Sequence, residues 1–349
     1  MIAEFISSTD WRWEAALSRM RHDFYHEPGY VTLCAKEEGA APAAFYAVEG
    51  EAMFLAPLLL RSLSPSLGVP SDWCDCVSPY GYSTPLMAGS EKHLSAFLEA
   101  YADTARMRGI VTAFFRLHPL LPLNLDILGK FGRLVKHGQT VYIDLSKSKE
   151  ELWRHTREDH RSDIRKLERQ GYRAVFDDWH RFDPFIELYH ATMKRLSARE
   201  HYLFSQNYFS DFRAVLGDRL HLCCVVSQDG ELACGGTYVE SDGIVQGHLA
   251  GTATSHIAAA PSKLMQHAVR NWAKDTGKEV FHLGGGVGAA CDTLFQFKAG
   301  FAKERADFFT YRMVIDESRY ALLTQHALAS QQGGNAPAEF FPLYRWPLV

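Results

Sequence analysis

The sequence predicts an α/β (α+β) protein with two domains. Its 349 residues exceed what one hydrophobic core usually organises and favour two domains of about 150 residues each. Apolar runs with strand character alternate with amphipathic helical segments along both halves of the chain. The composition, with 47% hydrophobic and 22% charged residues, is typical of soluble globular proteins.

Charge and hydropathy argue against several kinds of partner. The formal net charge is −4 at pH 7, so no global attraction to nucleic acid or to a membrane is expected, and we predict no DNA partner. The N-terminal segment MIAEFISSTD has an early acid and no basic region, which argues against a secretory signal. The longest apolar runs, such as residues 53–60, are too short to span a bilayer. We therefore expect a cytoplasmic protein with no integral membrane segment.

Cysteine and histidine spacing gives no sign of a metal site. The seven cysteines include no CxxC pair. Cys223 and Cys224 lie in an apolar run, so we expect buried free thiols in a reducing compartment. His22 and His26 have a helical spacing that suits zinc, but no third ligand accompanies them and Pro28 ends the helix. The sequence therefore predicts no metal site.

The first half of the chain predicts one α/β unit. Asp10 is a candidate N-cap for the first helix, and the turn-prone EGE separates the two strands of a predicted hairpin. Gly109 marks the end of a second amphipathic helix. The expected elements are a helix, two hairpin strands, a helix and two more strands, over residues 10–22, 43–48, 53–63, 92–108, 111–117 and 139–145.

A segment dense in Pro, Gly and Tyr, residues 71–86, follows the predicted hairpin. Its Tyr80 and Tyr82 carry hydroxyls on rigid rings. Arg116 and His118 lie at or just past the end of a predicted strand, where ligand groups often converge in α/β folds. Two interpretations stay open for the tyrosine-rich segment, a structural turn and the wall of a substrate cleft.

The second half begins with a basic segment, residues 151–173, which we expect to form one helix. It is interpreted either as a solvated, salt-bridged helix or as a contact to phosphate or RNA backbone through Arg161, Arg165, Lys166 and Arg169. A three-stranded meander with Asp-Gly turns at 229–230 and 242–243 follows further on. The remaining expected elements are a strand, a helix, a later helix and a strand, over residues 172–176, 182–196, 262–276 and 279–283.

The stretch FHLGGGVGAACDTLFQFKAGF, residues 281–301, contains the strongest candidate for a functional residue. If residues 293–301 are helical, Leu294, Phe297, Lys298 and Phe301 share one apolar stripe. An ammonium there must snorkel to a wet cleft, find an anionic partner or titrate low. A simple snorkelling lysine is the competing interpretation. In a strand, Lys298 would instead face away from the phenylalanines.

Common catalytic motifs are absent from the sequence. The spacing of GGGVGAA departs from GxGxxG, and no GxxxxGK[ST], GxSxG or HExxH is present. This pattern favours binding and orienting an amine or a phosphate over covalent catalysis by serine or cysteine. The order of meander, helix and strand is that of a GNAT-type acyltransferase, in which a helix N-terminus faces the pyrophosphate of acyl-CoA. The equivalent segment here, residues 253–269, lacks a glycine-rich loop.

Three segments resemble the FemAB/FemX family of the GNAT superfamily, which includes acetyltransferase relatives. They are RSDIRKLERQGY, SKLMQHAVRNWAKDTGKEVFHLGGG and LFQFKAGF, at residues 161–172, 262–286 and 294–301. The last is similar to the family's FKxGF element and puts Lys298 in the place of its cleft lysine. The segment SPYGYSTP, residues 78–85, is similar to an acceptor-side segment of GNAT-annotated relatives. No insertion is long enough for the coiled-coil arm that some members carry.

The resemblance implies two tandem GNAT-like domains, each with a mixed, largely antiparallel sheet flanked by helices. We expect them at residues 1–145 and 146–317, with the tail 318–349 a candidate addition to the first. It also implies an N-acyltransferase that uses aminoacyl-tRNA or acyl-CoA as co-substrate, with no tightly bound cofactor. The acceptor would be an amine of a peptidoglycan precursor, another cell-envelope precursor or a small molecule, and tRNA would be a partner. The alternative is a non-catalytic module that binds a glycan or peptide.

The candidate site residues fall in both halves of the sequence. Lys298 is the expected catalytic residue, acting on the donor or its charge. The expected substrate-binding residues are Tyr80, Tyr82, Arg116, His118, Arg199, Tyr202, His248, Gly285 and Phe297.

Overall fold

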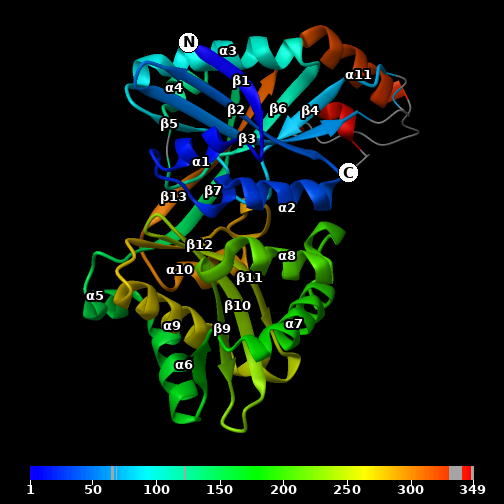
Figure 1. Cartoon of the computed structure of the whole chain (residues 1–349). Helices are drawn as coiled ribbons and strands as arrows, with labels where there is room; N and C mark the ends of the chain where they lie inside the picture. Colours follow the sequence, from blue (N-terminus) through cyan, green and yellow to red (C-terminus); the bar gives the residue numbers. More distant parts are fainter. Residues whose placement is uncertain (64–66, 68, 122, 330–339, 347–349) are drawn as a thin grey trace. The chain divides into compact units, whose positions relative to one another are not determined.

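The computed structural model describes residues 1–63, 67, 69–121, 123–329 and 340–346 (Figure 1). The chain forms two compact units. Unit 1 comprises Met1–His137 and Phe308–Val349, and unit 2 comprises Gly138–Asp307. Within the described part of the chain, no helix combines the length and apolarity needed to cross a bilayer.

The sheet of unit 1 has the strand order β1-β2-β3-β4-β6-β13, and β5 pairs with β3. Its neighbours pair antiparallel except β4 and β6, which run parallel. The predicted hairpin is confirmed, because Glu49 pairs with Ala52 across a tight turn in which Gly50 adopts a φ of 58°. The strands are β1 (Ile2–Ser7), β2 (Ala41–Glu49), β3 (Ala52–Ser62), β4 (Cys74–Val77), β5 (Leu86–Ala88), β6 (Ile110–Arg116) and β13 (Arg305–Val314), which begins in unit 2.

Helices pack on the unit 1 sheet and complete its core. Asp10 caps the first helix as predicted, since its side chain accepts a hydrogen bond from the Arg12 amide. That helix ends at Leu17, so the predicted extent to residue 22 is wrong. Asp23 caps a separate 3-10 turn there, Phe24–His26. The helices are α1 (Trp11–Leu17), α2 (Pro28–Glu38), α3 (Leu94–Met107), α4 (Leu125–Leu128) and α11 (Glu317–Ala329).

The sheet of unit 2 has the strand order β7-β12-β11-β10-β9-β8. Only the β11 and β12 pair is parallel among these neighbours. The predicted meander is confirmed, and Gly230 and Gly243 adopt positive φ in its two turns. The strands are β7 (Arg133–Asp144), which begins in unit 1, β8 (Arg173–Phe176), β9 (Leu220–Val226), β10 (Leu232–Ser241), β11 (Ile244–Thr252) and β12 (Val280–Gly284).

Helices cover both faces of the unit 2 sheet (Figure 1). The helix α9 packs on β8, β9, β10 and β12 and contacts α6, whereas α7 contacts β10 and β11. The face under α9 holds a buried cluster that includes Tyr238, Phe281 and Phe301. The helices are α5 (Lys149–His155), α6 (Glu158–Arg169), α7 (Phe182–Arg195), α8 (Gln206–Leu216), α9 (Ser262–Asp275) and α10 (Thr293–Ala299).

The predicted single basic helix over residues 151–173 is wrong. The helix α5 ends at His155, Thr156 has extended dihedral angles, and α6 begins at Glu158. The Arg157 amide between them donates to the carbonyl of Gly300 at 2.7 Å. This tertiary hydrogen bond takes the place of a helical one, so the break is set by a partner distant in sequence.

Candidate functional site

The strands β11 and β12 of unit 2 pair over only three residues. Ile244, Val245 and Gln246 face Val280, Phe281 and His282. Immediately after this, β11 bulges, because Tyr238 of β10 faces Gly247 whereas Thr237 faces Leu249. The bulge, at His248, raises the local twist and turns β11 away from a regular ladder. Gln246 and His282 form the last residue pair before the two strands separate, and Nδ1 of His282 donates a hydrogen bond to Oε1 of Gln246 at 2.7 Å.

The loop after β12 leads into α10, the helix that carries Lys298. Asp292 is the N-cap of α10, and its carboxylate accepts hydrogen bonds from the Phe295 amide at 2.8 Å and from the Val287 amide at 2.9 Å. Such a cap satisfies amides that a helix leaves without intrahelical partners. One carboxylate therefore ties the glycine-containing loop to the helix.

The Nζ atom of Lys298 donates to the carbonyl oxygen of Gly285 at 2.6 Å. The side chain is half-buried, and burial lowers the pKa of Lys298 to about 8, with Asp292 opposing the shift. The predicted helix is confirmed, and the strand alternative is wrong. The predicted stripe needs one correction. Leu294 is 40% exposed, and Phe295 is buried in its place, because the seven-residue helix is rotated about its axis relative to the expected stripe.

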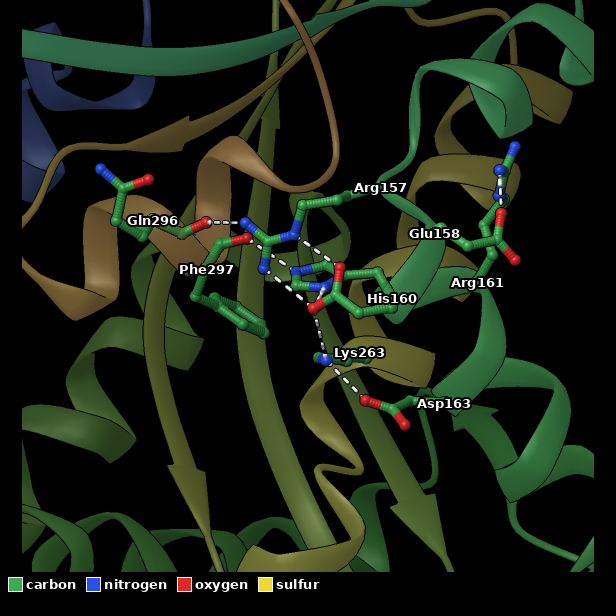
Figure 2. Close-up of polar contacts among 9 residues, drawn as sticks. Arg157, Glu158, His160, Arg161, Asp163, Lys263, Gln296 and Phe297 are labelled. Carbon is green, nitrogen blue, oxygen red and sulfur yellow. Dashed lines mark hydrogen bonds and ion pairs between the residues drawn. The ribbon is translucent and has the colours of Figure 1, made fainter.

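An open surface pocket of about 540 Å³ lies beside α10. Arg157 and Lys263 on its wall are paired with carboxylates, Arg157 with Asp159 at 2.5 Å and Lys263 with Asp163 at 2.6 Å (Figure 2). The hydrogen bond from Arg157 lowers the pKa of Asp159 well below its usual range. The lining residues are Arg157, His160, Lys263, Cys291, Asp292, Thr293, Gln296 and Phe297.

The chemistry of this pocket is mixed. Its lining offers an aromatic ring from Phe297, a hydroxyl from Thr293 and an exposed thiol from Cys291. Asp159 also accepts from Lys263 at 3.5 Å, so the cations of the wall are balanced by neighbouring acids. A ligand with an aromatic ring and phosphate groups would find both kinds of partner here, provided that its phosphates compete with these carboxylates.

Two of the basic side chains of α6 contact residues of unit 2. Arg161 forms an ion pair with Glu158, and the guanidinium of Arg165 lies 5.3 Å from the centre of the Trp153 ring. The interpretation of this segment as a salt-bridged helix therefore holds for Arg161. Lys166 and Arg169, in the last turn of α6, are exposed cations.

Three of the predicted site residues lie together in unit 2. Lys298 and Phe297 are adjacent on α10, and Gly285 provides the carbonyl that Lys298 contacts. Sequence reasoning missed Arg157, His160 and Lys263, which come from two other segments. The N-cap role of Asp292 could have been predicted, because it is an Asp directly before a helical pattern.

The other unit 2 candidates lie away from this pocket. Arg199 is exposed and Tyr202 is half-buried, and the carbonyl of Tyr202 accepts from the Tyr189 hydroxyl at 2.7 Å. His248 lies 3.2 Å from the Tyr208 hydroxyl through Nε2 and stacks on the ring of Phe212. Burial lowers the pKa of His248 to about 3, so this imidazole is neutral at pH 7.

Four candidates lie in unit 1. The rings of Tyr82 and His118 have centroids 6.0 Å apart. The carbonyl of Tyr80 accepts from the Tyr30 hydroxyl at 3.0 Å. Arg116 donates to the carbonyl of Ser78 at 3.1 Å and lies over the Phe114 ring.

A glycine fixes the tyrosine-rich segment, and a buried hydrogen-bonded pair, His118 and Asp23, lies beside its Tyr82. Gly81 has a φ of 106°, and an added Cβ would lie 2.1 Å from the Tyr25 ring, so only glycine fits. His118 is buried, and its Nε2 lies 3.0 Å from a carboxylate oxygen of buried Asp23. Its Nδ1 accepts from the Leu120 amide. Sequence reasoning missed the Asp23 and His118 pair, because 95 positions separate its members.

Comparisons with known proteins identify the fold. Residues 154–298 match the Acetyltransf_6 family, an acetyltransferase (GNAT) domain. A comparison with curated proteins gave no match. The solved structure of FemX superposes with a TM-score of 0.69 and 13% identity, covering 92% of this chain and 99% of that one. L-PGS from Bacillus licheniformis superposes with a TM-score of 0.58 and 15% identity, covering 95% and 100%.

A third solved structure is the C-terminal domain of a protein described as a lysylphosphatidylglycerol synthetase from Agrobacterium fabrum. It has a TM-score of 0.55 and 14% identity, and covers 93% of this chain and 96% of that one. The predicted resemblance is confirmed: the chain has the fold of FemX, and its residues 154–298 match the acetyltransferase (GNAT) domain family.

Proposed function

We propose that this protein is an N-acyltransferase that moves an aminoacyl or acyl group from an activated donor to an amine. The observation that carries the proposal is the contact between Lys298 and Gly285, which keeps a cation of lowered pKa where β12 leads into α10. The GNAT domain that contains both residues supports it. We assign Lys298 as the catalytic residue.

In the proposed reaction, the acceptor amine attacks the carbonyl carbon of the donor ester or thioester. Negative charge grows on the carbonyl oxygen and then on the leaving oxygen or sulfur, while the amine nitrogen loses a proton. An ammonium close to the reacting carbonyl stabilises this charge. A lysine with a pKa of about 8 can pass its proton to the leaving group and take up the proton that the amine nitrogen loses. No covalent enzyme intermediate is required.

We propose aminoacyl-tRNA as the donor, with acyl-CoA as the alternative. Both donors contain an adenosine near phosphate groups, and the pocket beside α10 offers the Phe297 ring and the cations Arg157 and Lys263. The segment directly before α9, residues 258–261, argues against ordinary use of CoA as the donor. It reads Ala258, Ala259, Ala260 and Pro261, without a glycine-rich loop and with one amide donor removed by the proline.

We propose a cell-envelope precursor as the acceptor. The fold that the chain shares with FemX and with a lysylphosphatidylglycerol synthetase domain supports this choice. The expected acceptor-side residues are Tyr80, Tyr82, Arg116 and His118 of unit 1. Arg199, Tyr202 and His248 of unit 2 are proposed as further substrate contacts.

The test combines binding and transfer. Native mass spectrometry with aminoacyl-tRNA and with acetyl-CoA should show a complex with the first. Transfer to an amine-bearing peptidoglycan precursor should then depend on Lys298. Lys298→Ala should lower kcat by about 100-fold, whereas Lys303→Ala, the matched change at an exposed lysine nearby, should leave it unchanged. Binding of acetyl-CoA alone would indicate an acetyltransferase, and binding of neither donor would favour the non-catalytic module.

A further inference from the structure

We infer that His160 is a positioning residue for Lys298, and that it acts by holding the C-terminal turn of α10 from the start of α6. This inference rests on the proposed function, in which Lys298 is the catalytic residue. It assigns a role to a side chain that neither the GNAT domain match nor the sequence motifs single out.

The helix α10 cannot hold its own shape. It has seven residues, well below the length of about 12 to 15 at which isolated helices become marginally stable in water. Its last carbonyls accept from nearby amides at short 3-10 spacing, Phe297 from Gly300 at 3.1 Å and Lys298 from Phe301 at 3.0 Å, and partners from outside the helix add to these bonds. The orientation of Lys298 therefore depends on what binds this end of the helix.

Three hydrogen bonds from the start of α6 supply partners from outside the helix, and Figure 2 shows the two that side chains make. Nε2 of His160 donates to the carbonyl of Phe297 at 3.0 Å. Arg157 donates twice, from Nη1 to the carbonyl of Gln296 at 3.3 Å and from its amide to the carbonyl of Gly300 at 2.7 Å. The carbonyl that His160 binds belongs to the residue directly before Lys298.

The imidazole of His160 fits a slot that the α10 sequence builds. The residue is 1% exposed, and its ring centroid lies 5.6 Å from that of Phe297 and 4.7 Å from that of Phe301. Gly300 opens the space, since an added Cβ would lie 2.4 Å from Nε2 of His160. The Phe-Lys-Ala-Gly-Phe segment is thus shaped around this ring, with both aromatics and the glycine in contact with it.

The tautomer of His160 follows from its partners. A carbonyl can only accept, so Nε2 carries a proton in the bond to Phe297. Nδ1 lies 3.2 Å from a carboxylate oxygen of Asp159, which is also held by Arg157 and Lys263. The bond to the Phe297 carbonyl is therefore made in the neutral Nε2-protonated form and in the charged form alike.

The experiment measures the ammonium of Lys298 directly. Acylation of surface amines over a range of pH, followed by peptide mass spectrometry, gives the midpoint at which Lys298 becomes reactive. We expect a midpoint near 8 in the unmodified chain. His160→Ala should raise it by about one pH unit towards an ordinary lysine, because a loosened α10 lets water reach the ammonium. His160→Gln, whose amide can donate from a similar position, should restore the original midpoint.

His190 of α7 provides a matched control. Its Nε2 donates to the carbonyl of Phe204 at 2.8 Å, and its ring packs against Tyr189 and Phe209. His190→Ala removes the same kind of hydrogen bond between aromatic rings from a different helix. It should leave the Lys298 midpoint unchanged. Thermal melting establishes that each variant is folded, and His160→Leu replaces His160→Ala if the alanine variant does not fold.

Activity gives an independent readout. With the true substrates, His160→Ala should lower kcat about tenfold with little change in the KM for the donor, and His160→Gln should recover most of the loss. An unchanged Lys298 midpoint in folded His160→Ala or His160→Leu would overturn the inference. The proposed function fails separately. If Lys298→Ala keeps full transfer activity while His160→Ala still shifts the midpoint, His160 positions Lys298 but Lys298 is not catalytic.

Discussion

The ammonium of Lys298 lies 2.6 Å from the carbonyl oxygen of Gly285, so the end of β12 and the helix α10 are joined by a cation. A neutral carbonyl replaces only part of the hydration that an ammonium loses on burial. The consequence is a lysine that titrates close to neutral pH, with a pKa lowered to about 8. Two predictions follow from this contact, one for activity and one for stability.

Transfer activity should fall as pH rises above about 8. The ammonium of Lys298 is lost through its folded pKa of about 8, and with it the positive charge next to the reacting carbonyl. Lys298→Arg keeps a charge that does not titrate in this range. The alkaline fall in kcat should therefore disappear in Lys298→Arg, even if its activity is lower throughout. A fall at the same pH in both proteins would assign the titration to another group.

Lys298→Met should stabilise the protein at pH 7. Folding lowers the pKa of Lys298 from 10.5 to about 8, which costs about 3 kcal/mol while the lysine is protonated in both states. Between pH 8 and 10.5 the unfolded chain binds the proton and the folded chain does not, so the stability of the unmodified protein rises with pH.

The Lys298→Met variant has no titrating group at this position, but it leaves the Gly285 carbonyl without the Lys298 donor. We expect a net gain of about 1 to 2 kcal/mol at pH 7, which shrinks towards pH 10. Urea unfolding of both proteins at pH 7 and at pH 9.5 measures the difference. A loss of stability that is equal at both pH values would contradict the assigned cost of burial.

Asp292→Ala should loosen the loop before α10. The carboxylate of Asp292 binds the amides of Phe295 and Val287, and loss of a helix N-cap typically costs about 1 kcal/mol. It also removes the charge that partly offsets the burial of Lys298, so the Lys298 pKa should drop further below 8. Asp10→Ala removes the comparable cap of α1 in unit 1. That variant should lose similar stability without any change at Lys298, as amine labelling over pH would show.

Local sequence patterns predicted the parts of the fold that local chemistry determines. The hairpin turn at Gly50 and the meander turn at Gly243 follow from residues that tolerate positive φ within a tight connection. The N-cap role of Asp10 depends on an amide only two residues away. These elements need no information from elsewhere in the chain, and each was found at its predicted position.

The misassigned elements depend on partners distant in sequence. The break between α5 and α6 exists because the Arg157 amide binds Gly300, and no helical periodicity reveals that bond. The same is true of the pocket wall, where His160 and Lys263 converge on α10 from two other helices. Lys298 was found because a lysine among phenylalanines is unusual in itself. Its neighbour Leu294 was misplaced because a seven-residue stripe fixes the buried face poorly.

Gly300→Ala should destabilise the protein through His160 specifically. The new Cβ would lie 2.4 Å from Nε2 of a fully buried imidazole that has no room to retreat between two phenylalanine rings. Overpacking of this kind costs about 1 to 3 kcal/mol. Gly247→Ala is the matched control in unit 2, since its added Cβ meets nothing closer than 3.7 Å, and it should change the free energy of unfolding far less.

A double-mutant cycle separates the clash from a general intolerance of alanine at Gly300. In a His160→Ala background the ring is gone, so Gly300→Ala should cost at least about 1 kcal/mol less than it does in the unmodified chain. Urea unfolding of the four proteins gives the coupling energy. Equal costs in both backgrounds would mean that Gly300 is required for another reason, and that the Phe-Lys-Ala-Gly-Phe segment is not shaped around the imidazole.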